Sequence, residues 1–173
     1  AGILTSSNVT MNATCIFKVE LNGTTPGAGY DQLNVRGSVA LGNAALVATL
    51  GFASAVSNTF TIINNDGADA VGGTFSGLAP NATLNISGIP FRISYTGGTG
   101  NDVVLTQLLP PPSLNSPSIS GTNLVFSWPS NYTGFVLECN TNLSSNVWTV
   151  VVPPPVISGT NYDVTDEAWP MVR

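Results

Sequence analysis

The sequence predicts an all-β protein, and three observations lead to this prediction. Apolar and polar residues alternate along several short segments, which is the period of a half-buried strand. The polar residues are mostly Asn, Thr and Ser, which favour strands and turns over helices. Turn signals recur throughout the 173 residues, which include 18 Gly and 12 Pro. No segment has the length and periodicity of a helix.

The first part of the chain, residues 1–108, predicts strands separated by turns. Residues 15–21 carry apolar side chains at odd positions, whereas Lys18 and Glu20 point the other way. The last two strands of this part flank a glycine-rich turn and are expected to form a hairpin. The expected strands are 15–21, 35–41, 46–52 and 60–63, followed by the hairpin strands 89–95 and 103–106.

A proline-rich linker, residues 109–117, divides the chain, because polyproline is a stiff spacer. The second domain, residues 118–173, again alternates apolar and polar side chains. Its turn signals recur roughly every 8 to 12 residues, which is typical of a small immunoglobulin- or fibronectin-like β-sandwich. Its expected strands are 124–128, 135–139, 147–152 and 162–165.

Composition excludes several classes of function. The chain has no histidine, which removes Ser-His-Asp and Cys-His catalysis and histidine metal sites. Its four cations, Lys18, Arg36, Arg92 and Arg173, are scattered, whereas nucleic-acid binding needs a basic patch. Charged residues make up 8% of the chain, and the net charge is -5. We therefore expect neither an enzyme nor a nucleic-acid-binding protein.

The sequence also predicts no membrane span. Its longest uncharged stretch, residues 37–65, is interrupted by Gly and Asn, so no apolar run is long enough to cross a bilayer. The chain opens directly with Ala1-Gly2-Ile3, without a visible signal peptide. We expect that a targeting segment has been removed and that the protein is secreted, extracellular or on the cell surface.

Short motifs follow one another through residues 15–107: ELNGTT (20–25), GYDQL (29–33), VALG (39–42), FTIINNDG (60–67), GTFSGL (73–78) and FRISYTGGTGND (91–102). This part of the chain resembles the end of the passenger region of large secreted bacterial proteins with autotransporter-associated β-strand repeats. Residues 118–165 resemble the small β-sandwich that often follows, through LVFSWP (124–129) and TGFVL (133–137). The resemblance implies a solenoid-like first domain, where composition alone leaves a sandwich-like one open. It also implies an extracellular stalk or fibre without catalytic residues.

One motif raises the possibility of a metal site. Residues 97–105 fit the calcium nonapeptide G-G-x-G-x-D-x-U-x, which makes Gly97, Gly100 and Asp102 weak calcium candidates. In calcium-binding repeats each ion lies between successive copies, and one copy cannot supply six to eight oxygens. A glycine-rich hairpin turn explains the same residues. We therefore predict no cofactor.

The two cysteines, Cys15 and Cys139, leave three interpretations open. Both lie on apolar strand faces, so they can be buried thiols that act as small hydrophobic residues. They can instead form an intrachain disulfide between the two domains, or an interchain bond that cross-links copies.

Two further groups of residues suggest contact with carbohydrate. Trp128 is expected in the core of the second domain, whereas Trp148 and Trp169 are candidates for stacking on sugar rings. Asn-x-Ser/Thr sequons make N-glycosylation possible, although strand alternation also produces them. The sequons are at Asn8, Asn12, Asn22, Asn81, Asn85, Asn131 and Asn142.

The predicted function is structural: a self-assembling fibre or filament subunit joined by β-strand addition. Residues 1–14 are strand-like but lie outside the main alternating pattern, so they are candidates for a strand exchanged with a neighbouring copy. The alternative is a carbohydrate-binding or adhesive module of a larger surface protein, with surface glycans as partners.

Overall fold

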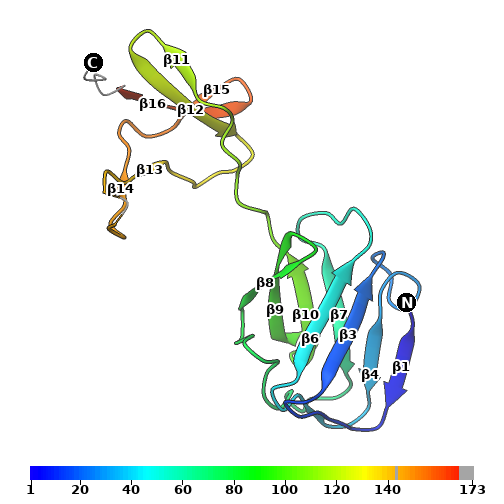
Figure 1. The fold of residues 1–173 in the computed structure, drawn as a ribbon. Helices are drawn as coiled ribbons and strands as arrows, with labels where there is room; N and C mark the ends of the chain where they lie inside the picture. The colour runs from blue at the N-terminus through cyan, green and yellow to red at the C-terminus, as the bar shows by residue number, and fades with distance from the viewer. Residues whose placement is uncertain (143, 168–173) are drawn as a thin grey trace. The chain divides into compact units, whose positions relative to one another are not determined.

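The structure is a computed structural model that describes residues 1–142 and 144–167 (Figure 1). These residues are all β and contain no helix, which confirms the predicted class; accordingly, no helix among them could cross a membrane. The chain divides into two compact units, unit 1 (Ala1–Pro110) and unit 2 (from Pro111 onward). The boundary falls within the proline-rich linker expected at 109–117.

Unit 1 begins with strands that stack in parallel at intervals of about 30 residues. Leu4 on β1 lies opposite Leu33 on β4, 29 positions further on, and Leu33 lies opposite Ile63 on β7. β2 pairs with β5 and β3 with β6 in the same parallel sense. We call residues 3–21 the first rung, 32–50 the second and 59–76 the third. The strands are β1 (Ile3–Ser6), β2 (Val9–Thr10), β3 (Ile16–Leu21), β4 (Gln32–Val35), β5 (Val39–Ala40), β6 (Ala45–Leu50) and β7 (Thr59–Asn65).

A corner replaces the single strand that the sequence predicted over residues 35–41. Val35 and Val39 are both buried, as the alternation implied, but the chain turns between them. Gly37 lies at this corner, where a Cβ would overlap the side chain of Asn8 in the first rung. Two alternating apolar residues therefore lie on two different faces of the rung, and only glycine fits between them.

The opposite end of the stack, which we call the far end, consists of antiparallel strands. β7 pairs with β10 (Asp102–Gln107), β10 with β9 (Ile89–Gly97) and β9 with β8 (Thr83–Ile86). The predicted hairpin of 89–95 and 103–106 is therefore confirmed. The resulting six-stranded sheet has the order β1-β4-β7-β10-β9-β8.

The core of unit 1 fills the space enclosed by the rungs. Eighteen buried hydrophobic residues form one cluster. Phe60 lies at its centre, with ring centroids of Tyr30, Phe52 and Phe91 at 5.4, 6.2 and 6.1 Å. The inward side chains of successive rungs thus form layers that cover one another.

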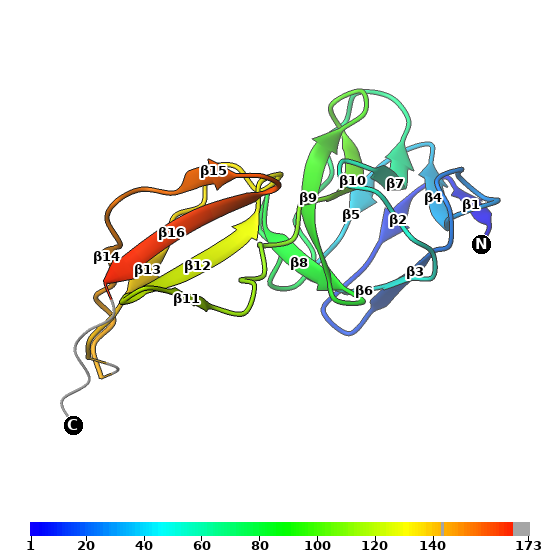
Figure 2. The same cartoon turned by 90° about the horizontal axis from the view of Figure 1, so that it is seen from above.

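Unit 2 is smaller and has a four-stranded antiparallel sheet of order β11-β12-β16-β15, with a separate pair β13-β14 (Figure 2). Its core cluster contains Trp128, Val151 and Val164. The strands expected at 135–139 and 147–152 are shorter than predicted. The strands are β11 (Ser118–Ser120), β12 (Asn123–Pro129), β13 (Glu138–Cys139), β14 (Thr149–Val150), β15 (Val156–Ser158) and β16 (Asn161–Glu167).

Candidate functional site

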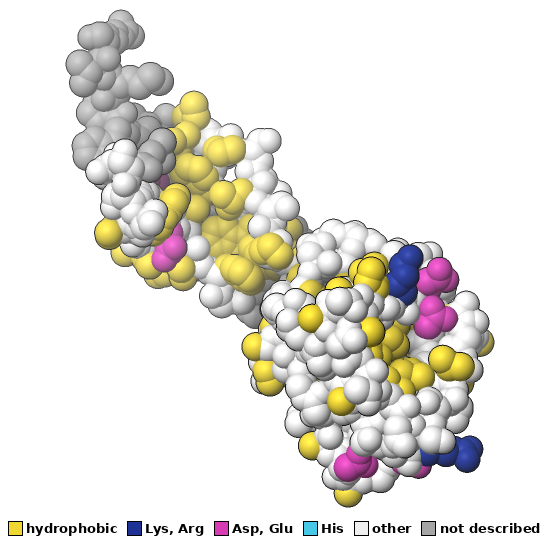
Figure 3. Space-filling model, turned by 60° about the horizontal axis from the view of Figure 1, so that its bottom comes forward, with side chains coloured by type: hydrophobic (Ala, Val, Ile, Leu, Met, Phe, Trp, Pro, Cys, Tyr) yellow, Lys and Arg dark blue, Asp and Glu magenta, His cyan; other side chains and the backbone are white. Residues whose placement is uncertain are grey.

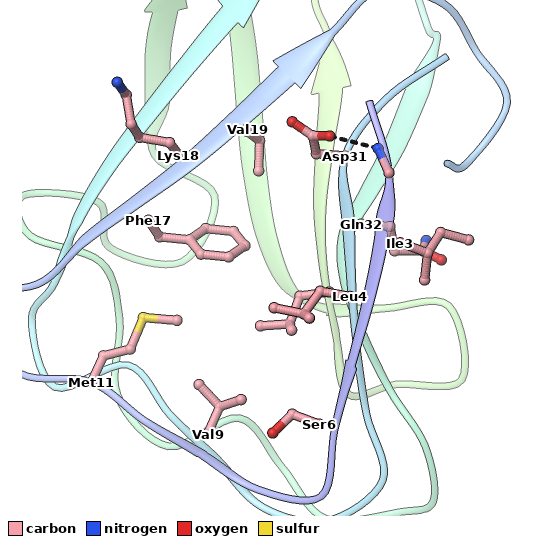
Figure 4. A pocket seen from close by; sticks show the side chains of 12 residues that line it. Ile3, Leu4, Ser6, Val9, Met11, Phe17, Lys18, Val19, Asp31 and Gln32 are labelled. Carbon is pink, nitrogen blue, oxygen red and sulfur yellow. Dashed lines mark hydrogen bonds between the residues drawn. The ribbon is translucent and has the colours of Figure 1, made fainter. Parts of the chain in front are cut away.

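A groove lies at the end of unit 1 that the first rung forms (Figure 4). It has a volume of about 540 Å³ and lies among β1, β2, β3 and β4. We call this groove, together with the outer edge of β1, the open end. Its main apolar lining residues are Leu4, Val9, Met11, Phe17, Val19 and Leu33.

The groove exists because the first rung is covered on one side only. Leu4, Leu33 and Ile63 occupy equivalent inward positions in the three rungs, since parallel in-register pairing keeps them on one face. Their exposed fractions are 69%, 6% and 0%. Leu33 and Ile63 are therefore buried because a neighbouring layer of strands covers them. Leu4 is exposed because no layer of the described residues covers it.

The backbone of β1 adds hydrogen-bonding groups to this apolar surface. On one side β1 pairs with β4, and on the other no strand of residues 1–142 or 144–167 pairs with it. Unpaired N–H and C=O groups on an edge strand can pair with another chain. Proteins usually protect such an edge with Lys, Pro or a bulge, but β1 has the sequence ILTS.

Asp31 holds the start of the chain in place at the open end. Its Oδ1 accepts a hydrogen bond from the Gly2 N–H at 2.8 Å (dashed line in Figure 4), and its Oδ2 accepts one from the Glu20 N–H at 2.9 Å. These charge-assisted bonds join β1 to β3. Residues 1–14, expected as an exchangeable strand, thus form β1 and β2 and pair within their own chain.

The open end carries few charged groups. Residues 1–17 contain no Asp, Glu, Lys or Arg. The N-terminal ammonium group lies 3.9 Å from Asp31 Oδ1, so these two opposite charges form a pair. Lys18 lines the groove with its stem, while its ammonium group points away from the cavity (Figure 4). A long side chain of this kind can cover apolar surface while its charge stays in water.

The calcium candidates form the turn of the β9–β10 hairpin. The carboxylate of Asp102, which is 5% exposed, accepts the Asn65 N–H at 2.9 Å. The Asn101 amide donates to the carbonyl oxygens of Gly67 and Asp69 at 3.1 and 3.2 Å. These bonds fasten the loop after β7 to the hairpin.

The structure thus gives the glycine-rich motif a structural role. A Cβ at Gly98 would overlap the Asp102 carboxylate, so the tight turn itself requires glycine there. Within residues 1–142 and 144–167, no group of three or more His, Cys, Asp and Glu is placed to hold a metal ion.

Both cysteines are free thiols, in different environments. Cys15 precedes β3 and is half-buried, whereas Cys139 on β13 is exposed, with its sulfur 3.5 Å from Thr149 Oγ1. The expectation of a buried thiol is therefore wrong for Cys139, because the short β13–β14 pair leaves both of its faces open to solvent.

The aromatic candidates are separated by the structure. Trp128 is buried, with its ring centroid 6.0 Å from that of Tyr162, as expected of a core residue. Trp148 is 56% exposed and directly precedes β14. Trp169 lies outside the described residues.

All seven sequon asparagines are exposed. Three of them already stabilise turns, because the Oδ1 atoms of Asn12, Asn85 and Asn142 accept backbone N–H groups two or three residues further on. Local turn chemistry accounts for these three without any modification, and N-glycosylation stays a prediction.

Sequence reasoning singled out residues 1–14 but missed the groove beneath them. Two signals were present in the sequence: the absence of Asp, Glu, Lys and Arg from residues 1–17, and the recurrence of similar inward residues at 4, 33 and 63. The second signal becomes visible only once the parallel register is known.

Comparisons of the chain with protein-family models, curated proteins and solved structures found no match.

Proposed function

We propose that this protein is an extracellular or cell-surface structural protein that assembles with copies of itself and does not catalyse a reaction. The open end carries the proposal, because it combines an apolar groove with the unpaired edge of β1. Burial of apolar surface and main-chain hydrogen bonds are the two contributions on which β-strand addition depends. Low charge weakens the repulsion between copies.

The proposal includes a finer description of the fold. Residues 1–107 are the end of a solenoid, a description supported by three rungs in parallel register about 30 residues apart. The antiparallel strands of the far end act as a terminal cap, which solenoids need for solubility. Unit 2 is a small immunoglobulin- or fibronectin-like sandwich, supported by its antiparallel sheet and separate strand pair.

A filament needs a second contact besides the open end, and unit 2 offers one. Ile119, Val147 and Val152 are 77%, 71% and 77% exposed. A second groove of about 230 Å³ includes Trp128, Phe135 and Leu137 in its lining. Exposed apolar side chains together with an apolar groove are typical of an interaction site.

Negative-stain electron microscopy of the native protein at micromolar concentration tests the proposal. We expect regular filaments with a short axial repeat from the wild-type chain. Leu4→Lys places a charge in the open end and is expected to shorten or abolish them, whereas Val47→Lys, on the outward face of the second rung, is expected to preserve them. Discrete single particles from the wild-type chain would contradict the proposal.

A carbohydrate-binding or adhesive module is the alternative from a different class, favoured by the exposure of Trp148. An exposed indole offers a flat apolar face on which a sugar ring can stack. The two functions are distinguished by a glycan array: saturable binding that Trp148→Ala abolishes supports the alternative.

A further inference from the structure

We propose that the open end binds the open end of a second copy about a two-fold axis, with β1 antiparallel to β1 of its partner. This inference rests on the proposed function for one premise, that the open end contacts another copy. It goes further by naming which surface of that copy is bound.

The partner surface must be apolar, and the far end does not provide such a surface. In residues 59–107, which make up the third rung and the far end, no Phe, Tyr, Leu, Ile or Val side chain is exposed. In the groove of the first rung, by contrast, Leu4 is 69% exposed, and Val9, Met11 and Phe17 beside it are half-buried. A head-to-tail contact would therefore cover the groove with polar surface, whereas a second open end supplies matching apolar surface.

The small number of charges at the open end permits this self-contact. In a two-fold interface the same patch is present on both sides, so an unpaired charge near the axis would face its own copy. Residues 1–17 carry no Asp, Glu, Lys or Arg. Asp31 and the N-terminal ammonium group form a pair of opposite charges, and the ammonium group of Lys18 points away from the groove (Figure 4). The groove and β1 can thus approach their own copies with little electrostatic repulsion.

The direction of the side chains restricts the register of the contact. Leu4 points into the groove (Figure 4). Successive side chains of a strand point to opposite faces, so Thr5, the next residue of β1, points outward. A two-fold axis normal to the sheet keeps the apolar faces of both copies on one side, so inward residues must oppose inward residues. The registers that satisfy this condition nearest the middle of β1 place Leu4 opposite Leu4, or Thr5 opposite Thr5.

Sedimentation velocity across a concentration series tests which surface is used. Leu4→Lys should raise the dissociation constant of the self-contact at least about tenfold, since a buried lysine opposes a second lysine in the partner. Val47→Lys is the matched control on an outward face of unit 1, and Val152→Lys is the control for the apolar surface of unit 2. A wild-type chain that stays monomeric overturns the proposal, as does a self-contact that Val152→Lys weakens and Leu4→Lys does not.

A spin label at Thr5 tests the two-fold arrangement directly. In a Cys15→Ser/Cys139→Ser background, Thr5→Cys carries the label on the outward side of β1. The two-fold contact places the two labelled residues directly or diagonally opposite each other, roughly 5 to 8 Å apart, and produces strong dipolar broadening in the EPR spectrum. A head-to-tail contact through β8 separates them by the width of six strands, roughly 29 Å at about 4.8 Å per strand, and the lines stay narrow.

The outcomes for the contact and for the function are separable. Filaments with narrow EPR lines would overturn the two-fold contact and leave the structural function standing. Dipolar broadening from particles no larger than dimers would support the two-fold contact and contradict the filament.

Discussion

Unit 1 buries eighteen hydrophobic residues in one cluster, whereas the corresponding cluster in the described part of unit 2 contains three. Their surfaces differ in the same way. Six large hydrophobic residues of unit 1 are exposed. The three most exposed, Ile3, Leu4 and Ile16, lie in the first rung, and the others are Val47, Val56 and Leu109. Those of unit 2 occur along most of its length. Figure 3 shows hydrophobic side chains over much of the visible face of unit 2 and in smaller patches on unit 1.

The difference follows from how each unit covers its apolar faces. Stacked rungs cover one another layer by layer, so residues become accessible mainly where the stack stops. Unit 2 has one four-stranded sheet and a separate two-stranded pair, and too few residues to cover both faces of the larger sheet. We infer that the contacts of unit 1 are concentrated at one end, whereas the apolar surface of unit 2 is spread over it.

The largest effect should come from removing the centre of the smaller core. Trp128→Ala deletes the largest of three buried side chains and should cost about 3–5 kcal/mol, as much as a domain of this size can have in total. In a ¹H–¹⁵N correlation spectrum, resonances of unit 2 should collapse to random-coil positions while those of unit 1 stay dispersed. Val147→Ala, at a residue that is 71% exposed, is the control. A dispersed spectrum of unit 2 in Trp128→Ala would show that its core extends beyond these three residues.

A similar substitution in unit 1 should destabilise that unit without unfolding it. Phe60→Ala removes a fully buried ring that meets three aromatic neighbours and should also cost about 3–5 kcal/mol, but the remaining layers should keep unit 1 folded. All three tryptophans lie in unit 2, so their fluorescence follows that unit alone, while far-UV circular dichroism follows both.

Urea titration of Phe60→Ala should therefore move the dichroism midpoint and leave the fluorescence midpoint unchanged. Val56→Ala, at a residue that is 46% exposed, should move neither. A joint shift of both midpoints in Phe60→Ala would mean that the two units unfold together.

Local sequence patterns correctly predicted the strands that can be recognised without knowing their distant partners in the sheet. The alternation of residues 15–21 corresponds to β3, where Val19 and Leu21 are buried and Lys18 and Glu20 are exposed. The glycine-rich turn correctly predicted the antiparallel hairpin, since both of its strands adjoin that turn in the sequence.

Parallel pairing could not be predicted in this way, because each partner lies about 30 residues away and no turn joins them. The corner at Gly37 was read as a strand interior for the same reason: its constraint is Asn8, in another rung. The open end, too, depends on residues that are far apart in the sequence. Residues 1–14 could be singled out from their composition, but the exposure of Leu4 depends on which layer is absent.

The smallest effect concerns a buried phenol of unit 1. The Tyr95 hydroxyl donates to the Leu78 carbonyl at 2.7 Å and accepts the Phe75 N–H at 3.1 Å. Tyr95→Phe leaves both backbone groups without this partner and should lower the free energy of unfolding of unit 1 by about 1–3 kcal/mol at pH 7.

Measurements at alkaline pH separate the contribution of the Tyr95 hydroxyl group from the packing of its ring. Burial raises the pKa of Tyr95 above its usual value of about 10, partly offset by its hydrogen bond with Phe75, and burial also raises the pKa of Tyr30. A raised pKa in the folded state means that the unfolded chain loses its protons first as the pH rises. Stability is therefore complete below about pH 10 and declines above it. Urea titrations from pH 7 to 11 should show a shallower decline for Tyr95→Phe, because Tyr30 then remains as the buried tyrosine of unit 1 with a raised pKa. An unchanged decline would mean that deprotonation of Tyr95 does not limit the alkaline stability of the rung stack.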